Sequence, residues 1–311
     1  MNKEPLVSII MPVYNIEKYL ELSLNSIKNQ TMPNFECIMV VQVSQDKSAD
    51  ICKKFANEDN RFVFIEIATP GISHARNIAL DLAKGNYISF IDGDDVVENT
   101  FLEDLINNID DKTDMVICGK IREKKFKPSK KVKHYRIYSY DRNDTMDRMI
   151  CAKVFNGTCT DKLFKRELIG QIRFHEDLHF SEDAVFDFEY LMKCTNIKFI
   201  NKTLYHYINH RDSASNADFN LKQLTCIDAY EYIAQNAPTE KIKQSAIAWK
   251  GALAMMLLYY IKRSHIKDDE NYSYLLNVLK ESLPYFKKCK YIKWYIRWFR
   301  HFVYFVFKII K

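Results

Sequence analysis

Short apolar runs alternate with segments of helical spacing in the first hundred residues. Four runs are almost continuously apolar, as expected of strands buried on both faces, and they lie at 6–12, 35–43, 62–67 and 86–91. Between them apolar side chains recur every three or four positions, which predicts helices over 16–30, 48–57 and 73–83. Ser73 is a candidate N-cap for the third helix, and Gly85 follows its end. The alternation predicts an α/β fold whose mostly parallel, Rossmann-like sheet is covered by helices on both faces.

The pattern becomes mostly helical toward the C-terminus. After the fourth run the spacing predicts, in order, a helix over 101–108, a strand over 114–118, helices over 155–169 and 184–193, strands within 198–209, and helices over 229–261, 275–283 and 285–311. We therefore expect an α/β domain over 1–215 followed by a helical C-terminal region over 216–311.

Polar clusters follow three of the predicted strands. They are Tyr14-Asn15, the segment from Gln42 to Asp46, and the segment from Asp92 to Asp95. In parallel sheets, ligands bind beyond the carboxyl ends of the strands. The three clusters therefore predict a binding site at that edge of the sheet.

Charge is distributed unevenly along the 311 residues. The chain carries 46 Lys and Arg against 40 Asp and Glu, a formal net charge of +6. From residue 218 onward there are 16 basic and 8 acidic side chains, which leaves 30 and 32 before that point. A second basic cluster, 120–136, holds nine basic residues and one acid, and the sequence leaves open whether it is a solvated loop or a surface for an acceptor or membrane.

The eight cysteines and the N-terminus bear on the cellular compartment. The cysteines form neither a CxxC pair nor a zinc-type Cys/His spacing, and several lie in apolar runs, so we expect reduced core thiols. The first residues lack the apolar core of a signal peptide, and no window of 18 uncharged apolar residues occurs. These features predict a cytoplasmic protein without a membrane-spanning helix.

The segment Asp92-Gly93-Asp94-Asp95 is the strongest chemical signal. Three carboxylates within four residues repel one another unless a cation or a ligand rich in donors lies among them. Oxygen ligands of this kind suit Mg²⁺ or Mn²⁺ held together with substrate phosphates. An acidic turn that only caps the next helix is the alternative that spacing alone leaves open.

Several segments together resemble the ordered motifs of family 2 glycosyltransferases. The segments are Val7 to Asn15, Gly71-Ile72-Ser73-His74-Ala75-Arg76-Asn77, Asp92-Gly93-Asp94-Asp95, Asp161 to Arg166, Ser181-Glu182-Asp183 and Leu204-Tyr205-His206-Tyr207. The resemblance covers roughly residues 5 to 215. It implies a GT-A fold in which a nucleotide-binding half (1–119) is joined to an acceptor half (120–215). It also implies a transferase that moves a hexosyl or N-acetylhexosaminyl group.

Site residues follow from the same resemblance. The nucleotide-sugar is expected to contact Pro12, Val13, Tyr14, Gln42, Asp46, Arg76, Asp92 and Gly93. Asp94 would be the direct metal ligand of the Asp-x-Asp motif, with Asp92 and, by a looser match, His210 on the metal side. Asp183 matches the family's general base, although it is also a residue expected at a helix N-terminus. Both roles are compatible.

One segment departs from the family pattern. Where members commonly carry several acids after the second strand, this chain has Val41-Gln42-Val43-Ser44-Gln45-Asp46, and only Asp46 plainly remains. The Gln42 amide can still accept or donate, but with less charge assistance than a carboxylate. The resemblance favours a UDP-sugar as the donor. The altered segment, however, offers fewer carboxylates than other members have for contacts to the base and ribose.

The last segment, 285–311, has eight basic residues and no acid. On a helical wheel most of its charges form one arc opposite large aromatic side chains, which is typical of a helix lying on an anionic membrane. A helix packed on the catalytic domain or across a homodimer is the alternative. Nucleic acid is not an expected partner, because the other faces are apolar rather than polar.

The sequence thus predicts a metal-dependent (Mn²⁺ or Mg²⁺), inverting glycosyltransferase. It would transfer a sugar to a glycan or lipid-linked acceptor in surface polysaccharide synthesis, at the inner face of the cell membrane. The alternative is a catalytically silent relative that acts as a membrane-associated assembly partner.

Overall fold

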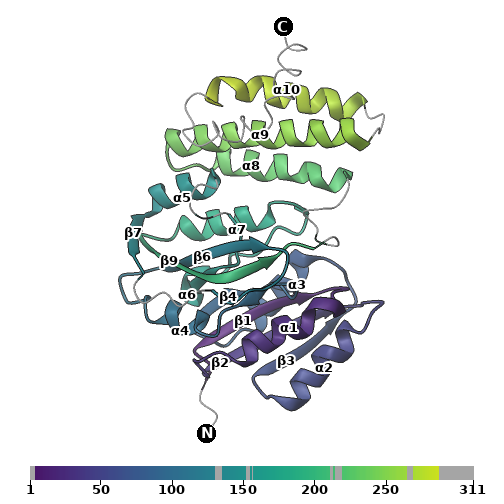
Figure 1. The fold of residues 1–311 in the computed structure, drawn as a ribbon. Coiled ribbons are helices and arrows are strands. Elements are labelled where there is room, and N and C mark those ends of the chain that lie inside the picture. The colour runs from purple at the N-terminus through teal and green to yellow at the C-terminus, as the bar shows by residue number, and fades with distance from the viewer. Residues whose placement is uncertain are drawn as a thin grey trace. The chain divides into compact units, whose positions relative to one another are not determined.

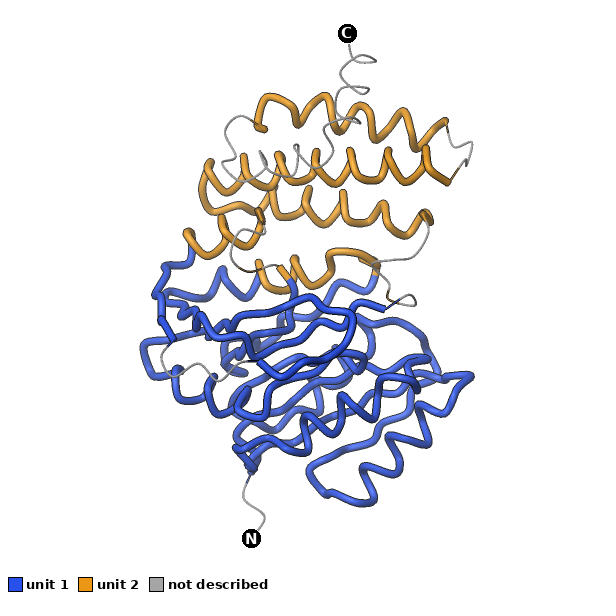
Figure 2. Tube along the Cα trace, viewed as in Figure 1, with its two compact units in different colours: residues 1–142, 158–176, 189–211 blue, residues 143–157, 177–188, 212–311 orange. Residues whose placement is uncertain are grey.

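A computed structural model describes residues 4–129, 135–151, 155, 157–210, 213, 219–264 and 269–286. The chain forms two compact units (Figure 2). Unit 1 consists of 1–142, 158–176 and 189–211, and unit 2 of 143–157, 177–188 and 212–311. The helix predicted over 285–311 lies outside the described residues from position 287 onward.

Unit 1 is built on a nine-stranded sheet (Figure 1). Its strands are β1 Val7–Val13, β2 Phe35–Gln42, β3 Phe62–Ile67, β4 Tyr87–Phe90, β5 Val96–Val97, β6 Met115–Glu123, β7 Ile137–Asp141, β8 Lys162–Lys165 and β9 Asn196–Ile208. They lie in the order β3-β2-β1-β4-β8-β6-β9-β5, and β7 also pairs with β9.

The sheet is mostly parallel, as predicted. β1 pairs in parallel with β2 and β4, and β2 with β3. β8 is antiparallel to both β4 and β6, so β6 and its parallel partner β9 run in the same direction as β4. The carboxyl ends of β1, β2, β4, β6 and β9 therefore meet at one edge. β5 and β7 run opposite to β9.

Helices cover both faces of the sheet around β1. The helices that lie in unit 1 are α1 Glu17–Lys28, α2 Ser48–Glu58, α3 Ile72–Leu82, α4 Phe101–Ile106 and α6 Arg166–Ile169. Val7, Ile9 and Met11 pack in one buried cluster with Leu20 and Leu24 of α1, to which α2 also contributes. α3 packs against β1 and β2 and lies on the far side of the sheet from α1 and α2 (Figure 1). This arrangement confirms the prediction of a sheet covered on both faces.

Two local predictions are wrong. The helix expected over 155–169 is replaced by β8 and the short α6, because β8 takes its hydrogen bonds from β4 and β6, and this pairing overrides the local helical spacing. Ser73 is not an N-cap. That position is held by Gly71, whose φ of 146° favours glycine, and Ser73 lies inside α3.

Unit 2 contains a stack of helices. α8 Thr225–Gln235, α9 Glu240–Ser264 and α10 Asp269–Phe286 pack side by side, and a 3₁₀ turn, Leu221–Leu224, precedes α8 (Figure 1). The segment 229–261 is largely helical, as predicted, and it is divided between α8 and α9 because Pro238 disfavours helical backbone at the residue before it. No helix in the described part of the chain combines the length and the apolar content needed to cross a bilayer.

The two units do not divide the chain at residue 215. α5 Arg142–Ile150 and α7 Glu182–Leu191 lie largely in unit 2. The physical reason is contact with the C-terminal helices: Asp147 of α5 accepts a hydrogen bond from Ser245 Oγ (2.7 Å) and pairs with Lys241 Nζ (2.8 Å). The functional halves expected at 1–119 and 120–215 stay a prediction.

Close packing of α9 on α10 depends on Gly251. A Cβ at this position would lie 2.3 Å from Ser282 Cβ and 2.8 Å from Phe286 Cε1. We expect Gly251→Ala to lower the free energy of unfolding in urea by about 1–3 kcal/mol, since overpacking outweighs the gain of about 1 kcal/mol in helix propensity. Ser282→Gly should partly rescue it. A stability unchanged by Gly251→Ala would contradict the close approach.

Candidate active site

The Asp92–Asp95 turn lies at the carboxyl edge of the sheet, as predicted. The turn follows β4, and the chain beyond β9 reaches the same edge. There His210 Nε2 lies 2.8 Å from Asp94 Oδ2. The His210 ring also stacks on Tyr19 of α1, with 3.9 Å between ring centroids. The structure thus brings together two of the predicted metal-side residues, which are 116 positions apart in the sequence.

Asp95 is the buried carboxylate of the turn and is only 1% exposed. Its oxygens accept hydrogen bonds from the Tyr205 hydroxyl (2.7 Å) and from the Ile208 backbone N–H (2.9 Å). Burial, together with the nearby Asp92 and Asp94 carboxylates, raises the pKa of Asp95 well above its ordinary value. Burial and Asp92 likewise raise the pKa of Asp94, against the opposing effect of His210.

Arg76 holds the remaining carboxylate. Its NH2 group lies 3.0 Å from Asp92 Oδ1, and its guanidinium lies over the Phe174 ring, 5.1 Å from the centroid. The Arg76 side chain is 3% exposed, whereas that of Asp92 is 30% exposed. α3 therefore presents a buried cation to the turn, next to the carboxylate that faces solvent. Gly93 lies between the two predicted ligands, and a Cβ at this position would lie 2.5 Å from Ile16 Cδ1.

The divergent segment after β2 is bonded to the segment after β1. Asp46 accepts hydrogen bonds from the backbone N–H groups of Glu17 (2.9 Å) and Ser48 (3.0 Å), the first residues of α1 and α2. Burial opposes ionisation, but these bonds outweigh it and lower the pKa of Asp46. The Glu17 carboxylate in return accepts from Lys47 N–H (2.9 Å). Asp46 thus has a structural role whether or not it contacts a ligand.

Gln42 is also engaged within the protein. Its Oε1 accepts the backbone N–H of Gly71 (2.7 Å), the N-cap residue before α3, and the residue is 5% exposed. Pro12 and Val13 are buried in β1, whereas the Tyr14 ring is 51% exposed at the strand end. Pro12, Val13 and Gln42 are therefore buried within β1 and β2, whereas Tyr14, directly after β1, exposes its aromatic ring.

Asp183 belongs to unit 2, whereas the site segments described so far belong to unit 1. It is the second residue of α7, and its Oδ1 accepts the backbone N–H of Ala184 (2.8 Å). The preceding Ser181 has a φ of 65°. Asp183 is one of the groups that raise the pKa of the buried Tyr230, after burial itself. The predicted place of Asp183 at the start of a helix is confirmed.

Two residues of the site were not assigned a role from the sequence. Asp95 and Tyr205 both lie inside motifs of the family, but neither spacing nor composition indicates that their side chains meet. Tyr205 joins Asp95 to the backbone N–H of Asp92, which donates to its hydroxyl (3.3 Å). Only the adjacency of β5 and β9 brings them together.

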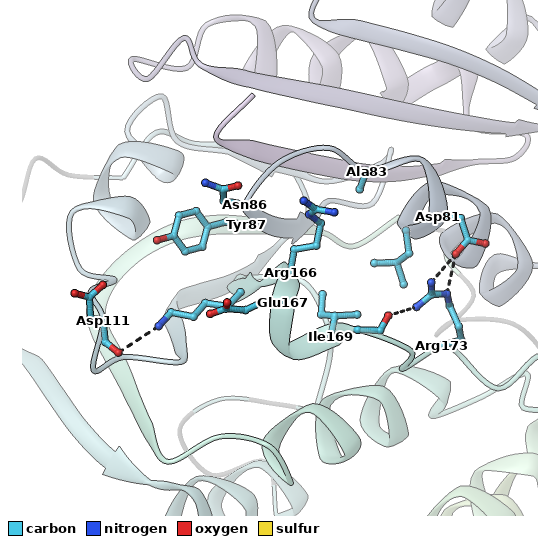
Figure 3. Close-up of a pocket in the computed structure, with 12 residues that line it drawn as sticks. Asp81, Ala83, Asn86, Tyr87, Asp111, Arg166, Glu167, Ile169 and Arg173 are labelled. Atoms are coloured by element: carbon cyan, nitrogen blue, oxygen red, sulfur yellow. Dashed lines mark hydrogen bonds and ion pairs between the residues drawn. The ribbon is translucent and has the colours of Figure 1, made fainter. Parts of the chain in front are cut away.

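A cavity of 740 Å³ in unit 1 is lined by residues other than those of the turn, among them Asp81, Tyr87 and Arg173 (Figure 3). Tyr87, which lines it, opens β4, so the cavity lies near the end of that strand opposite the Asp92–Asp95 turn. Arg173 is paired with Asp81 (2.6 Å), and Arg166 Nε donates to the Gly85 carbonyl (2.6 Å). These side chains have partners within the protein, and we assign them no part in the chemistry of the turn.

The donor set of the turn suits a divalent cation. Asp92 and Asp94 offer carboxylate oxygens and His210 a ring nitrogen, and a cation would relieve the repulsion that raises the pKa of Asp94. In the part of the chain that the structure describes, no three His, Cys, Asp or Glu side chains already form a metal-binding group. The residues therefore fit a metal by type and charge.

Comparison with known proteins places the chain in a family. The family model described as glycosyl transferase family 2 matches residues 8–173. The chain belongs to this family.

The chain is similar to several bacterial proteins. It is 33% identical to EpsH of Bacillus subtilis over 217 residues, which is 67% of this chain and 62% of EpsH. It is 28% identical over 302 residues to the minor teichoic acid biosynthesis protein GgaB of Bacillus subtilis (89% and 32%). It is 30% identical over 214 residues to the poly(ribitol-phosphate) beta-glucosyltransferase of Bacillus spizizenii (66% and 32%). The matches thus span less than two thirds of the length of each of these relatives.

Solved structures share the fold. S. aureus TarS 1–349, in complex with UDP-GlcNAc, superposes with a TM-score of 0.66 at 23% identity, covering 90% of this chain and 81% of that one. The mannosyltransferase PcManGT of Pyrobaculum calidifontis, in complex with GDP-Man and Mn²⁺, gives 0.61 at 16% identity, covering 97% and 85%. The predicted GT-A fold, followed by C-terminal helices, is confirmed.

The Tyr205 hydroxyl is expected to hold the turn together. Tyr205→Phe removes the hydrogen bond to Asp95 and leaves a buried carboxylate short of a donor. We expect the free energy of unfolding, measured by urea denaturation, to fall by about 1–3 kcal/mol. Tyr87→Phe is the control, since the Tyr87 hydroxyl makes no hydrogen bond within the described residues. Equal stabilities of the two variants would contradict this role.

Proposed function

We propose that the protein is a metal-dependent, inverting glycosyltransferase. It would transfer a sugar from a nucleotide-diphosphate sugar to a hydroxyl group of a glycan or lipid-linked acceptor. The observation that carries the proposal is the Asp92–Asp95 turn of a family 2 chain, with Arg76 and His210 bonded to its two outward carboxylates. UDP-sugar is the favoured donor.

Each residue has a distinct part in the proposed mechanism. The acceptor hydroxyl oxygen attacks C1 of the sugar, its proton passes to the Asp183 carboxylate, and the bond from C1 to the diphosphate breaks. Attack opposite the leaving group inverts the configuration at C1. Mn²⁺ or Mg²⁺, held by Asp94 with Asp92 and His210, would supply the positive charge that stabilises the diphosphate.

Arg76 would act beside these groups. Because its guanidinium is buried and already bonded to Asp92, it holds that carboxylate in place at little entropic cost when substrate binds. The Asp92 oxygen that Arg76 leaves open would face the ribose or a metal-bound water. Tyr14, exposed at the end of β1, would lie against the nucleobase together with the backbone of Pro12 and Val13.

The base contact would differ from that of a carboxylate. With Gln42 Oε1 bonded to Gly71 N–H, the side-chain group left for a ligand is the amide nitrogen, which donates. Gln42 would therefore pair with a carbonyl oxygen of the base. Uracil offers such an oxygen, and a base contact from Asp46 is not needed for this arrangement.

Surface glycan synthesis is the proposed setting. Two similar proteins are named for teichoic acid and for poly(ribitol-phosphate), which supports an acceptor from a cell-surface polymer. The segment 285–311 would bind the anionic inner face of the cell membrane. A catalytically silent, membrane-associated assembly partner is the second candidate, and the altered 42–46 segment favours it.

A nucleotide panel with Mn²⁺ tests the donor assignment. We expect the thermal midpoint of the full-length protein to rise with UDP or a UDP-sugar, since binding to the native state stabilises it by mass action. Adenosine, guanosine and cytidine diphosphates are the comparison ligands. If no nucleoside diphosphate stabilises the protein, the silent partner is favoured instead.

Two substitutions test the mechanism. Asp94→Asn should lower kcat by roughly 100- to 1,000-fold by weakening charge stabilisation, and Asp183→Asn by roughly 100- to 10,000-fold by removing the base. Asp50→Asn, an exposed acid of α2, is the matched control and should retain full activity. Unchanged sugar transfer by either site variant would overturn the mechanism.

Removal of residues 287–311 tests the membrane assignment. We expect the full chain to co-sediment with vesicles containing phosphatidylglycerol and the truncated chain to stay in the supernatant, because each basic residue near the surface contributes about 1 kcal/mol. Raising the salt concentration should release the full chain as well. Binding that survives the truncation would show that another surface is responsible.

A further inference from the structure

Lys120 occupies an irregular position in the sheet. The register between β6 and β9 shifts on both sides of Gly119, so that Cys118 pairs with Ile200 but Lys120 pairs with Tyr205. A Cβ at Gly119 would lie 2.9 Å from the Lys202 carbonyl oxygen, so the close approach of the two strands requires glycine. Irregularities of this kind redirect side chains and recur next to active sites. Here it places Lys120 beside Tyr205.

The Lys120 ammonium group is held by neutral groups. Its Nζ donates to the hydroxyls of Thr158 and Thr160, the latter at 3.2 Å, and lies 5.7 Å from the centroid of the Tyr205 ring. Among the described residues, no carboxylate lies within ion-pair distance of it. Lys120 is therefore a half-buried cation, held by hydroxyls, that has no counter-ion in the described part of the chain.

The neighbouring Lys162 shows the contrast. It is fully buried, and its Nζ pairs with Asp161 Oδ1 at 2.9 Å and with backbone carbonyls of the same segment. That lysine is neutralised within the fold, as a buried charge normally must be. Two cations thus share the 158–162 segment with one acid, and the charge that remains belongs to Lys120.

Lys120 also lies close to the carboxylate turn. The Tyr205 ring that it contacts carries the hydroxyl bonded to Asp95 and to Asp92 N–H. Thr160, which accepts a hydrogen bond from Lys120, forms an isolated backbone β-bridge with Phe90, two residues before Asp92. Lysine binds phosphate as a point charge. A phosphate group is therefore the ligand expected for this ammonium, which has no carboxylate partner among the described residues and lies at the edge of a proposed diphosphate site.

We propose that Lys120 binds a phosphate group of a substrate, either the diphosphate of the donor or a phosphate of the acceptor polymer. The inference rests on the proposed function and adds a residue that the motifs do not indicate. The two threonine hydroxyls hold the ammonium in place before the ligand arrives. The phosphate oxygen supplies the counter-ion that Lys120 does not have among the residues that the structure describes.

The first test measures anion binding alone. Inorganic pyrophosphate is titrated calorimetrically into the full-length protein in metal-free buffer containing EDTA. We expect Lys120→Met to weaken binding by about 10- to 100-fold, as expected for a lost charge-assisted hydrogen bond, and Lys120→Arg to restore most of it. Lys28→Met is the matched control, because Lys28 also lies over an aromatic ring (5.5 Å from Phe55) but on the far end of α1. It should bind like the unmodified protein.

A second pair of measurements separates the two sources of phosphate. If the donor diphosphate is bound, Lys120→Met should weaken UDP binding about as much as pyrophosphate binding while uridine binding stays unchanged. If the acceptor phosphate is bound, UDP binding should be retained and KM for a poly(ribitol-phosphate) acceptor should rise about tenfold or more.

Pyrophosphate binding that Lys120→Met leaves within twofold of the unmodified protein would overturn the inference, as would no detectable binding to the unmodified protein. Such a result leaves the nucleotide panel unaffected. Conversely, pyrophosphate binding that depends on Lys120, in a protein that no nucleotide stabilises, would refute the proposed function and leave the phosphate site standing.

Discussion

The structure depends most on how three carboxylates are kept together at the end of β4. Each has a partner from a different part of unit 1. Arg76 of α3 binds Asp92, His210 beyond β9 contacts Asp94, and Tyr205 within β9 donates to Asp95. Since like charges this close disfavour ionisation, each partner stabilises the turn and is itself held by it. The turn therefore links α3, β4 and β9, which are far apart in the sequence.

The same edge of the sheet shows how one segment can serve both fold and ligand. Asp46 satisfies N–H groups at the starts of two helices, and Gln42 satisfies the N–H of Gly71 before a third. Helix N-termini are left with unpaired donors, so these acceptors stabilise the fold directly. This explains why a carboxylate can persist at position 46 irrespective of any base contact. It also leaves the amide nitrogen, a donor, as the group of the Gln42 side chain that is not used in this bond.

Lys120 and Lys162 both contact the segment 158–162, but they differ in burial and in the groups that hold them. Lys162 is fully buried and pairs with Asp161, whereas Lys120 is half-buried and, within the described ranges, is bonded to two hydroxyls and lies over a ring. The partner of Lys162, Asp161, is the residue directly before it in the sequence, whereas the partners of Lys120 lie about 40 positions away. The position of Lys120 beside Tyr205 follows from the register shift at Gly119, which is a property of the paired strands.

Local sequence patterns were sufficient for the elements around β1. The strand at 62–67 has the predicted bounds, and the Asp92–Asp95 turn lies at the carboxyl edge of the sheet, as the polar clusters after the strands predicted. By contrast, the helix expected over 155–169 is mostly strand and loop, because pairing with β4 and β6 is a long-range interaction. The contacts of His210 with Asp94, of Tyr205 with Asp95, and of Lys120 with Tyr205 likewise follow from strand order and register. The sequence by itself determined the family, the alternation of elements and the acidic turn, since these depend on residue type and spacing. Which side chains meet that turn was decided only by the tertiary structure, since parallel strands bring distant residues to one edge.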